Sequence, residues 1–175
     1  REQAREKNSQ IAKKLGIEKS IEFKAEEIAR VGGSHVDIAI ALHACDTATD
    51  DAIAWAVKSN AGLVLVAPCC QHDLQSKLKE IPEPWSLVTK HGILKERLAD
   101  ILTDSIRAQI LKLLGYRTDV IEFIGGEHTP KNLLIRGVKT EAKPEQIEIA
   151  RYQEMLKELG VTPALAVRLG DSFTF

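Results

Sequence analysis

The sequence predicts an α/β fold with a mostly parallel sheet covered by helices. Two apolar runs, residues 36–42 and 63–67, have the length of strands, and residues 49–59 between them have the length and composition of one helix. Parallel strands that are buried on both faces read as continuous apolar runs, and strands that alternate with helices form parallel sheets. We therefore expect a strand–helix–strand unit at the centre of the fold.

Shorter elements precede this unit. Residues 1–15 are polar and helix-forming, and Gly16 suits the position that closes a helix. Residues 21–24 (IEFK) are a strand candidate, and Glu26 follows within two residues. This acid has two interpretations: a residue in the first turn of a helix, where acids are favoured, or a carboxylate that meets a ligand at the end of a strand. Residues 32–34 indicate a turn.

A long amphipathic helix and a hairpin are expected after the unit. Apolar side chains recur at spacings of three and four over residues 95–114, which is typical of a helix with one buried face. The other expected elements are a short helix at 73–79, a loop at 81–85, two antiparallel strands at 116–124 and 132–138, and a last helix at 145–159. The pattern does not assign residues 161–175.

Composition narrows the function classes. The 175 residues suit one domain, and 24 basic against 25 acidic residues leave a net charge of -1, so the chain has no global basic field for nucleic acid. No apolar run has the length of a membrane span, and no signal peptide is visible. Three cysteines, an odd number, favour the reducing cytoplasm over a disulfide framework. A start at Arg1, inside an expected helix, predicts that the chain is a fragment of something longer.

Reactive side chains follow both core strands. The first run ends in His43-Ala44-Cys45-Asp46, and the second ends in Pro68-Cys69-Cys70-Gln71-His72. Ligands of open α/β sheets bind outside the carboxyl ends of the strands, and neighbouring strands lie ~4.8 Å apart. We therefore expect the two clusters to meet and to form the functional site.

Each catalytic candidate also has a structural interpretation. His43 suits a general base because its unperturbed pKa is ~6.5, or its ring bonds a backbone group. Asp46 either orients hydrogens of a substrate or caps the helix that follows. Cys69 is a candidate covalent nucleophile because Pro-Cys at the end of a strand resembles the cysteine motif of pyrimidine C5 methyltransferases.

Thiols and imidazoles so close together also suit zinc. The candidate ligands are His43, Cys45, Cys69, Cys70 and His72. Adjacent cysteines are not the usual C-x₂-C spacing, however, and free cysteine is often a small buried apolar residue. From the sequence we therefore assign no metal ligand.

A second candidate surface lies near the hairpin. Lys131, Arg136 and Lys139 form a modest basic strip next to Asn132. Such a strip contacts phosphate in an RNA substrate, or it is a solvated hairpin edge whose lysines prevent aggregation.

Three segments together resemble a known family. The segments are LHACDTATDDAIA, VAPCCQHDL and the run Arg107…GlyTyr…EFIGGEHTPKNLLIR. They are similar to class I S-adenosylmethionine-dependent methyltransferases, in a poorly characterised branch that includes proteins with a ribosomal-RNA adenine dimethylase domain. The resemblance implies a Rossmann-like fold and S-adenosylmethionine as the cofactor. It also implies the roles of single residues: Ala25, Glu26, Leu42, His43, Ala44 and Cys45 beside the cofactor, and Pro68, Cys70, Gln71, His72, Lys131 and Asn132 beside the substrate.

The sequence differs from that family in its N-terminal part. The Gly-rich loop after the family's first strand and the acid after its second strand are absent, so residues 1–140 are expected to be the C-terminal portion of a methyltransferase domain. Residues 141–175 are expected to pack on the same domain.

We expect a cytoplasmic methyltransferase whose methyl acceptor is RNA, with a protein as the second candidate acceptor, and no membrane partner. The alternative is a metal- or thiol-dependent binding module on a methyltransferase-like shell. The oligomeric state does not follow from the sequence.

Overall fold

The computed structural model describes residues 2–32, 34–42, 44–78, 81, 83–123, 125, 132–140 and 142–175. The chain forms two compact units, Arg1–Gly32 and Gly33–Phe175. The candidate functional residues at the ends of the two core strands all belong to the second unit. The expected domain boundary at residue 140 stays a prediction.

The first unit consists of one helix followed by extended chain. Helix α1 (Glu2–Lys14) ends near Gly16, which has a positive φ of 70°, as expected for a helix terminus. A single turn of 3₁₀ helix, η1 (Ile28–Arg30), follows. Residues 21–24, all described, form no strand, so this prediction is wrong. The physical reason is that a strand needs a hydrogen-bonded neighbour, and none of the described strands pairs with this segment.

The second unit contains a four-stranded mixed sheet in the order β1-β2-β4-β3. The strands are β1 (Ile38–Leu42), β2 (Leu63–Ala67), β3 (Tyr116–Glu122) and β4 (Leu133–Lys139). The predicted parallel pairing of β1 with β2 is confirmed, with Ile38 opposite Leu63 and Leu42 opposite Ala67. The predicted antiparallel hairpin of β3 and β4 is also confirmed. A mostly parallel sheet is wrong, because β4 lies between β2 and β3 and runs against both.

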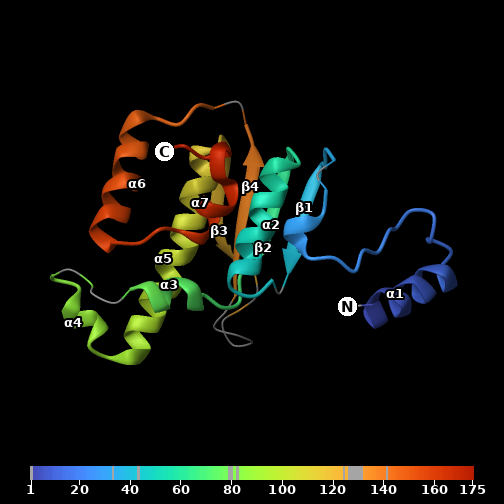
Figure 1. Ribbon diagram of the computed structural model, residues 1–175, viewed down its shortest axis with the longest axis horizontal. Helices are drawn as coiled ribbons and strands as arrows, with labels where there is room; N and C mark the ends of the chain where they lie inside the picture. The colour runs from blue at the N-terminus through green and yellow to red at the C-terminus, as the bar shows by residue number, and fades with distance from the viewer. Residues whose placement is uncertain are drawn as a thin grey trace. The chain divides into compact units, whose positions relative to one another are not determined.

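Helices connect the strands and cover one face of the sheet. Figure 1 shows α2 and α7 in front of the strands. The helices of this unit are α2 (Thr47–Lys58), α3 (His72–Lys77), α4 (Ser86–Thr89), α5 (Gly92–Leu113), α6 (Gln146–Leu159) and α7 (Ala164–Leu169), followed by the 3₁₀ turn η2 (Gly170–Ser172). The sequence predicted α2, α3, α5 and α6 with small shifts of their ends, whereas α4, α7 and η2 were not assigned.

The core lies between that face of the sheet and the helices. Alternate strand positions enter it, together with buried side chains of α2, α5, α6 and α7; examples are Ala39, Val64, Val66, Ile53, Ile110, Tyr152 and Leu165. The opposite side of β1 is open: Ile38, Ile40 and Leu42 are 55%, 63% and 59% exposed. The expectation that β1 is buried on both faces is therefore wrong, because the helices of the second unit form their core with the other face, that of Ala39, Val64 and Val66.

Helices that could cross a membrane were sought in the described part of the chain. None of its helices combines the length and the apolar character that a membrane crossing requires.

The short helix α7 is the part of the tail that the sequence left unassigned, and its packing is testable. Leu165 is fully buried, whereas Val167 on the same helix is 65% exposed. Leu165→Ala is expected to lower the free energy of unfolding by about 2–5 kcal/mol, because it leaves a cavity in the core. The matched control Val167→Ala is expected to change it by less than about 0.5 kcal/mol. Urea denaturation of both variants measures this, and equal midpoints would show that α7 does not pack on the core.

Candidate active site

The two strand-end clusters meet, as the sequence predicted for parallel neighbours. Leu42 lies opposite Ala67 at the last position of the paired strands, so both chains leave the sheet at the same edge. Beyond the strands, the Asp46 N–H donates a hydrogen bond of 3.2 Å to the Cys70 carbonyl oxygen. The loop after β1 and the loop after β2 are thus joined directly by their backbones.

The side chain of Asp46 stabilises α3 and not α2, the helix that directly follows it. It stands at the start of α2, but its side chain makes no capping hydrogen bond there. Its Oδ1 instead accepts a 3.0 Å hydrogen bond from the backbone N–H of Asp73, in the first turn of α3. Its φ of 52° is unusual for a residue other than glycine. Of the two interpretations of Asp46, the one as a side-chain cap of α2 is therefore wrong. Its carboxylate caps α3 instead.

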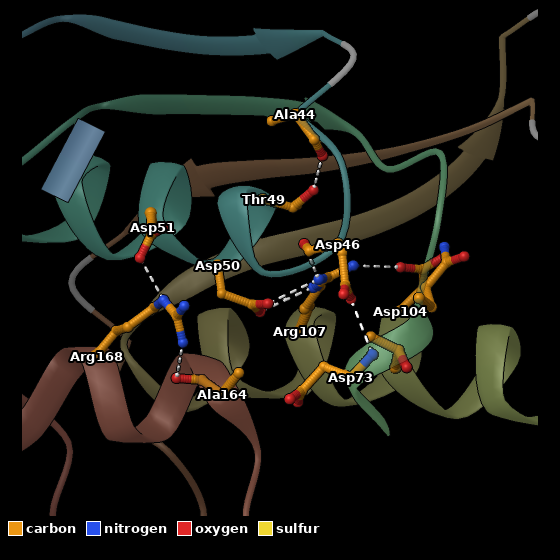
Figure 2. A network of polar contacts seen from close by, with 12 residues as sticks. Ala44, Asp46, Thr49, Asp50, Asp51, Asp73, Asp104, Arg107, Ala164 and Arg168 are labelled. Atoms are coloured by element: carbon orange, nitrogen blue, oxygen red, sulfur yellow. Dashed lines mark hydrogen bonds and ion pairs between the residues drawn. The ribbon is translucent and has the colours of Figure 1, made fainter. Parts of the chain in front are cut away.

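A buried arginine fixes both loops from below (Figure 2). Arg107 of α5 is 1% exposed and forms a two-pronged ion pair with Asp50 of α2, at 2.9 Å from Nε and 2.8 Å from Nη2. Its Nη1 donates to Asp104 at 3.1 Å, and its Nη2 donates to the Asp46 carbonyl oxygen at 2.8 Å. Asp104 in turn accepts a 2.9 Å hydrogen bond from the Gln71 side chain. One guanidinium thus reaches the loop after β1 directly and the loop after β2 through Asp104.

The charges of this network compensate one another in the core. Burial alone disfavours the charged guanidinium, but the hydrogen bonds and the charges of Asp50 and Asp104 leave the pKa of Arg107 raised. Burial raises the pKa of the Asp104 carboxyl, against the lowering effects of Arg107 and of the Gln71 hydrogen bond. Both aspartates are almost fully buried. Removal of the arginine would therefore leave two carboxylates in the core without their cation.

Three cysteine thiols gather at the same edge. The Cys45 and Cys69 Sγ atoms are 2.9 Å apart, and the Cys69 and Cys70 Sγ atoms are 3.5 Å apart. The hydrogen bond with Cys45, followed by burial, raises the pKa of the Cys69 thiol to about 12. Because the thiolate is the reactive form, a thiol with this pKa is a poor nucleophile at neutral pH. This disfavours the hypothesis that Cys69 attacks the substrate covalently.

A groove opens next to the loop after β2. Its volume is ≈ 540 Å³, within the range of about 300–1,000 Å³ typical of small-molecule sites. Two of the predicted substrate residues, Pro68 and Gln71, line it together with one face of α5. The charged residues of its wall are mostly acidic: Glu96, Asp100 and Asp104 against Arg97.

The remaining predicted site residues are scattered. Ala25 and Glu26 are exposed in the first unit. Leu42 and Ala44 flank His43 at the end of β1, but His43 itself and Lys131 lie outside the described residues. His72 is exposed at the start of α3, with its Nδ1 3.4 Å from the Gln75 side chain.

The two described residues of the expected basic strip, Arg136 and Lys139, do not line this site. Arg136 pairs with Asp119 at 2.9 Å on the neighbouring strand. Lys139 hydrogen-bonds the Asn60 side chain and lies 5.8 Å above the Tyr116 ring. It follows Val138, which is opposite Leu63 at the amino end of β2. Asn132 is buried and bonds Glu122. The two described basic residues are thus engaged away from the carboxyl ends of β1 and β2.

Sequence reasoning missed the charged network. From the sequence, none of Asp50, Asp104 and Arg107 was assigned a partner. A signal was present in α5: the acid and the arginine are three residues apart among positions of the buried face, next to Ile106 and Ile110. Charged residues on a buried helix face need partners, so this spacing predicts a buried ion pair but not its third member.

Comparison with known proteins gives a family match over the front of the chain. A family model described as a methyltransferase domain matches residues 1–77. The match includes β1, α2, β2, both strand-end loops and the three cysteines. No curated protein matches, and no solved structure matches. The matched segment supports a methyltransferase in general, and it contains both strand-end loops of the site, whereas Asp104, Arg107 and the α5 wall of the groove lie beyond it.

The buried arginine provides the stability test of this site. Arg107→Met is expected to lower the free energy of unfolding by about 3–5 kcal/mol, because Asp50 and Asp104 stay buried without their cation. The control Arg136→Met removes an exposed ion pair and is expected to cost about 0–1 kcal/mol. Urea denaturation measures both variants. A cost for Arg107→Met no larger than that of the control would contradict the network.

Proposed function

We propose that this protein is a methyltransferase that uses S-adenosylmethionine, with methyl transfer at the carboxyl ends of β1 and β2. One observation carries the proposal: the two strand-end loops are joined through Asp46 and Cys70, within the segment that matches the methyltransferase-domain model. Loops at this edge of an α/β sheet are the usual place for a ligand. Four of the residues that the resemblance assigns to cofactor and substrate, Cys45, Pro68, Cys70 and Gln71, also lie at this edge.

The residue types at this edge fit the cofactor. S-adenosylmethionine supplies a methyl group that its sulfonium already activates, and it carries positive charges. The half-buried carboxylate of Asp46 suits a cationic group, and the exposed side chain of Leu42 offers an apolar surface at the end of β1. We propose that the loop after β1, Leu42 to Asp46 in the sequence, binds the methionine part. Glu26 is proposed to bind the adenosine part.

The protein's contribution to such a reaction is mainly alignment of the acceptor. Gln71 is suited to this because its side chain is oriented by the buried carboxylate of Asp104 while it lines the groove. His43 is proposed as the base that takes the acceptor's proton, since its unperturbed pKa is near ~6.5.

The acceptor has two candidates. RNA is the acceptor proposed from the resemblance. The acidic wall of the groove is a specific observation in favour of the second candidate, a protein side chain flanked by basic residues, because like charges repel phosphate. We propose the cytoplasm as the location, because its reducing conditions keep the three cysteines as thiols.

Cofactor binding tests the proposal. Calorimetric titration of S-adenosylmethionine into the natural polypeptide that carries these residues is expected to show one binding site. Asp46→Asn keeps an oxygen for the Asp73 N–H but removes the negative charge, so the affinity is expected to fall about tenfold or more, equivalent to about 1.4 kcal/mol. The control Asp171→Asn changes an exposed acid of η2 and is expected to leave the affinity unchanged.

Glu26 has its own matched control in the adjacent acid. Glu26→Gln is expected to weaken binding, whereas Glu27→Gln is not, since the resemblance assigns only Glu26 to the cofactor. Absence of binding to a well-folded protein, or equal affinities for all four variants, would overturn the proposal. Transfer of a labelled methyl group to RNA or to protein in the same preparation then distinguishes the two acceptors.

A further inference from the structure

The three thiols at the edge of the sheet have the spacing of ligands that share one ion. Cys45 and Cys69 Sγ atoms lie 2.9 Å apart, Cys69 and Cys70 Sγ atoms lie 3.5 Å apart, and all three lie within 4.8 Å of one another. Zinc–sulfur bonds of about 2.3 Å in a tetrahedron place ligand sulfurs ~3.8 Å apart. The Cys45–Cys69 and Cys69–Cys70 separations are shorter than this value and the third pair lies within 4.8 Å, so a small movement of the side chains gives all three sulfurs a common centre.

The backbone around the thiols is already held in place. The Asp46 N–H, next to Cys45, donates to the Cys70 carbonyl oxygen, and the Asp46 carbonyl oxygen accepts from the buried Arg107. Metal sites need ligands that the surrounding structure positions in advance. Here the same contacts that join the two loops also set the separation of the cysteines.

The exposure of the thiols suits an ion that enters from solvent. Cys45 is exposed, and Cys69 and Cys70 are half-buried. Cysteines that serve only as small apolar residues are usually fully buried. A disulfide would use two of the sulfurs and leave the third, whereas a soft or borderline cation uses all three.

We propose that Cys45, Cys69 and Cys70 bind one Zn²⁺ ion through three thiolates, with the fourth coordination position open to solvent. Each thiol gives up its proton to the solvent when its sulfur binds the ion, so three protons are released for each zinc ion bound. Three protein ligands and one open position are the arrangement of exchangeable rather than closed structural zinc sites. This inference goes beyond the methyltransferase proposal and does not depend on it.

Metal titration of the reduced protein tests the site. Zinc analysis after gel filtration is expected to give one Zn²⁺ per chain, and Co²⁺ in its place is expected to give the intense near-ultraviolet thiolate-to-cobalt absorption. Zinc is also expected to slow alkylation of all three cysteines by N-ethylmaleimide in the unmutated protein. This last measurement needs no variant, so it stands even where a cysteine variant folds poorly.

Single substitutions identify the ligands. Cys45→Ser, Cys69→Ser and Cys70→Ser are each expected to weaken zinc binding by roughly 100-fold or more, since each removes one of three thiolates. The control His91→Ala changes an exposed histidine at the start of α5 and is expected to leave the affinity unchanged. The proposal is overturned if the reduced protein binds no zinc, if the serine variants bind it as tightly as the parent, or if Co²⁺ gives no thiolate absorption. A disulfide between two of the cysteines, with no zinc bound after its reduction, would likewise overturn it.

Discussion

The buried guanidinium of Arg107 is the interaction on which the arrangement of the second unit depends. It contacts Asp50 of α2, Asp104 of the same helix and the backbone of the loop after β1. A buried ion pair adds little net stability compared with apolar residues of the same volume, but its disruption is costly. The main effect of Arg107 is therefore positional: its hydrogen bonds fix α2 and the loop after β1 relative to α5. The same contacts that pack the helices thus also position the site.

Hydrogen bonds from this network position both strand-end loops of the site. The Asp46 carbonyl oxygen is bound by Arg107, its N–H by Cys70 and its carboxylate by the first turn of α3. Asp104 extends the same network to Gln71 at the groove. Both strand-end loops are thus fixed by hydrogen bonds with α3 and α5. A reaction that depends on alignment of two substrates benefits from such fixed loops, and so does a cluster of thiols that must hold one ion.

The local parts of the fold were predictable from the sequence, whereas the long-range parts were not. The parallel pair β1–β2 and the convergence of Cys45 with Cys69 and Cys70 follow from two apolar runs of strand length that each end in polar or thiol residues. The position of β4 between β2 and β3 was missed, because strand order depends on pairing between distant segments. The open face of β1, with Ile40 exposed, was missed because an apolar run reads the same for an edge strand and a buried one. Arg107 was missed because its partner Asp50 is far away in the sequence.

The central claim is that the loop after β1 binds the methyl donor. Ultraviolet cross-linking of S-adenosylmethionine labelled in its methyl group, followed by tryptic mapping, tests it most directly. The lysines and arginines of the sequence place this loop in one peptide, residues 31–58, and the loop after β2 in the next, residues 59–77. The account predicts that the label enters the 31–58 peptide and that excess S-adenosylhomocysteine prevents it. Label confined to peptides other than 31–58, or label that the competitor does not reduce, would contradict it.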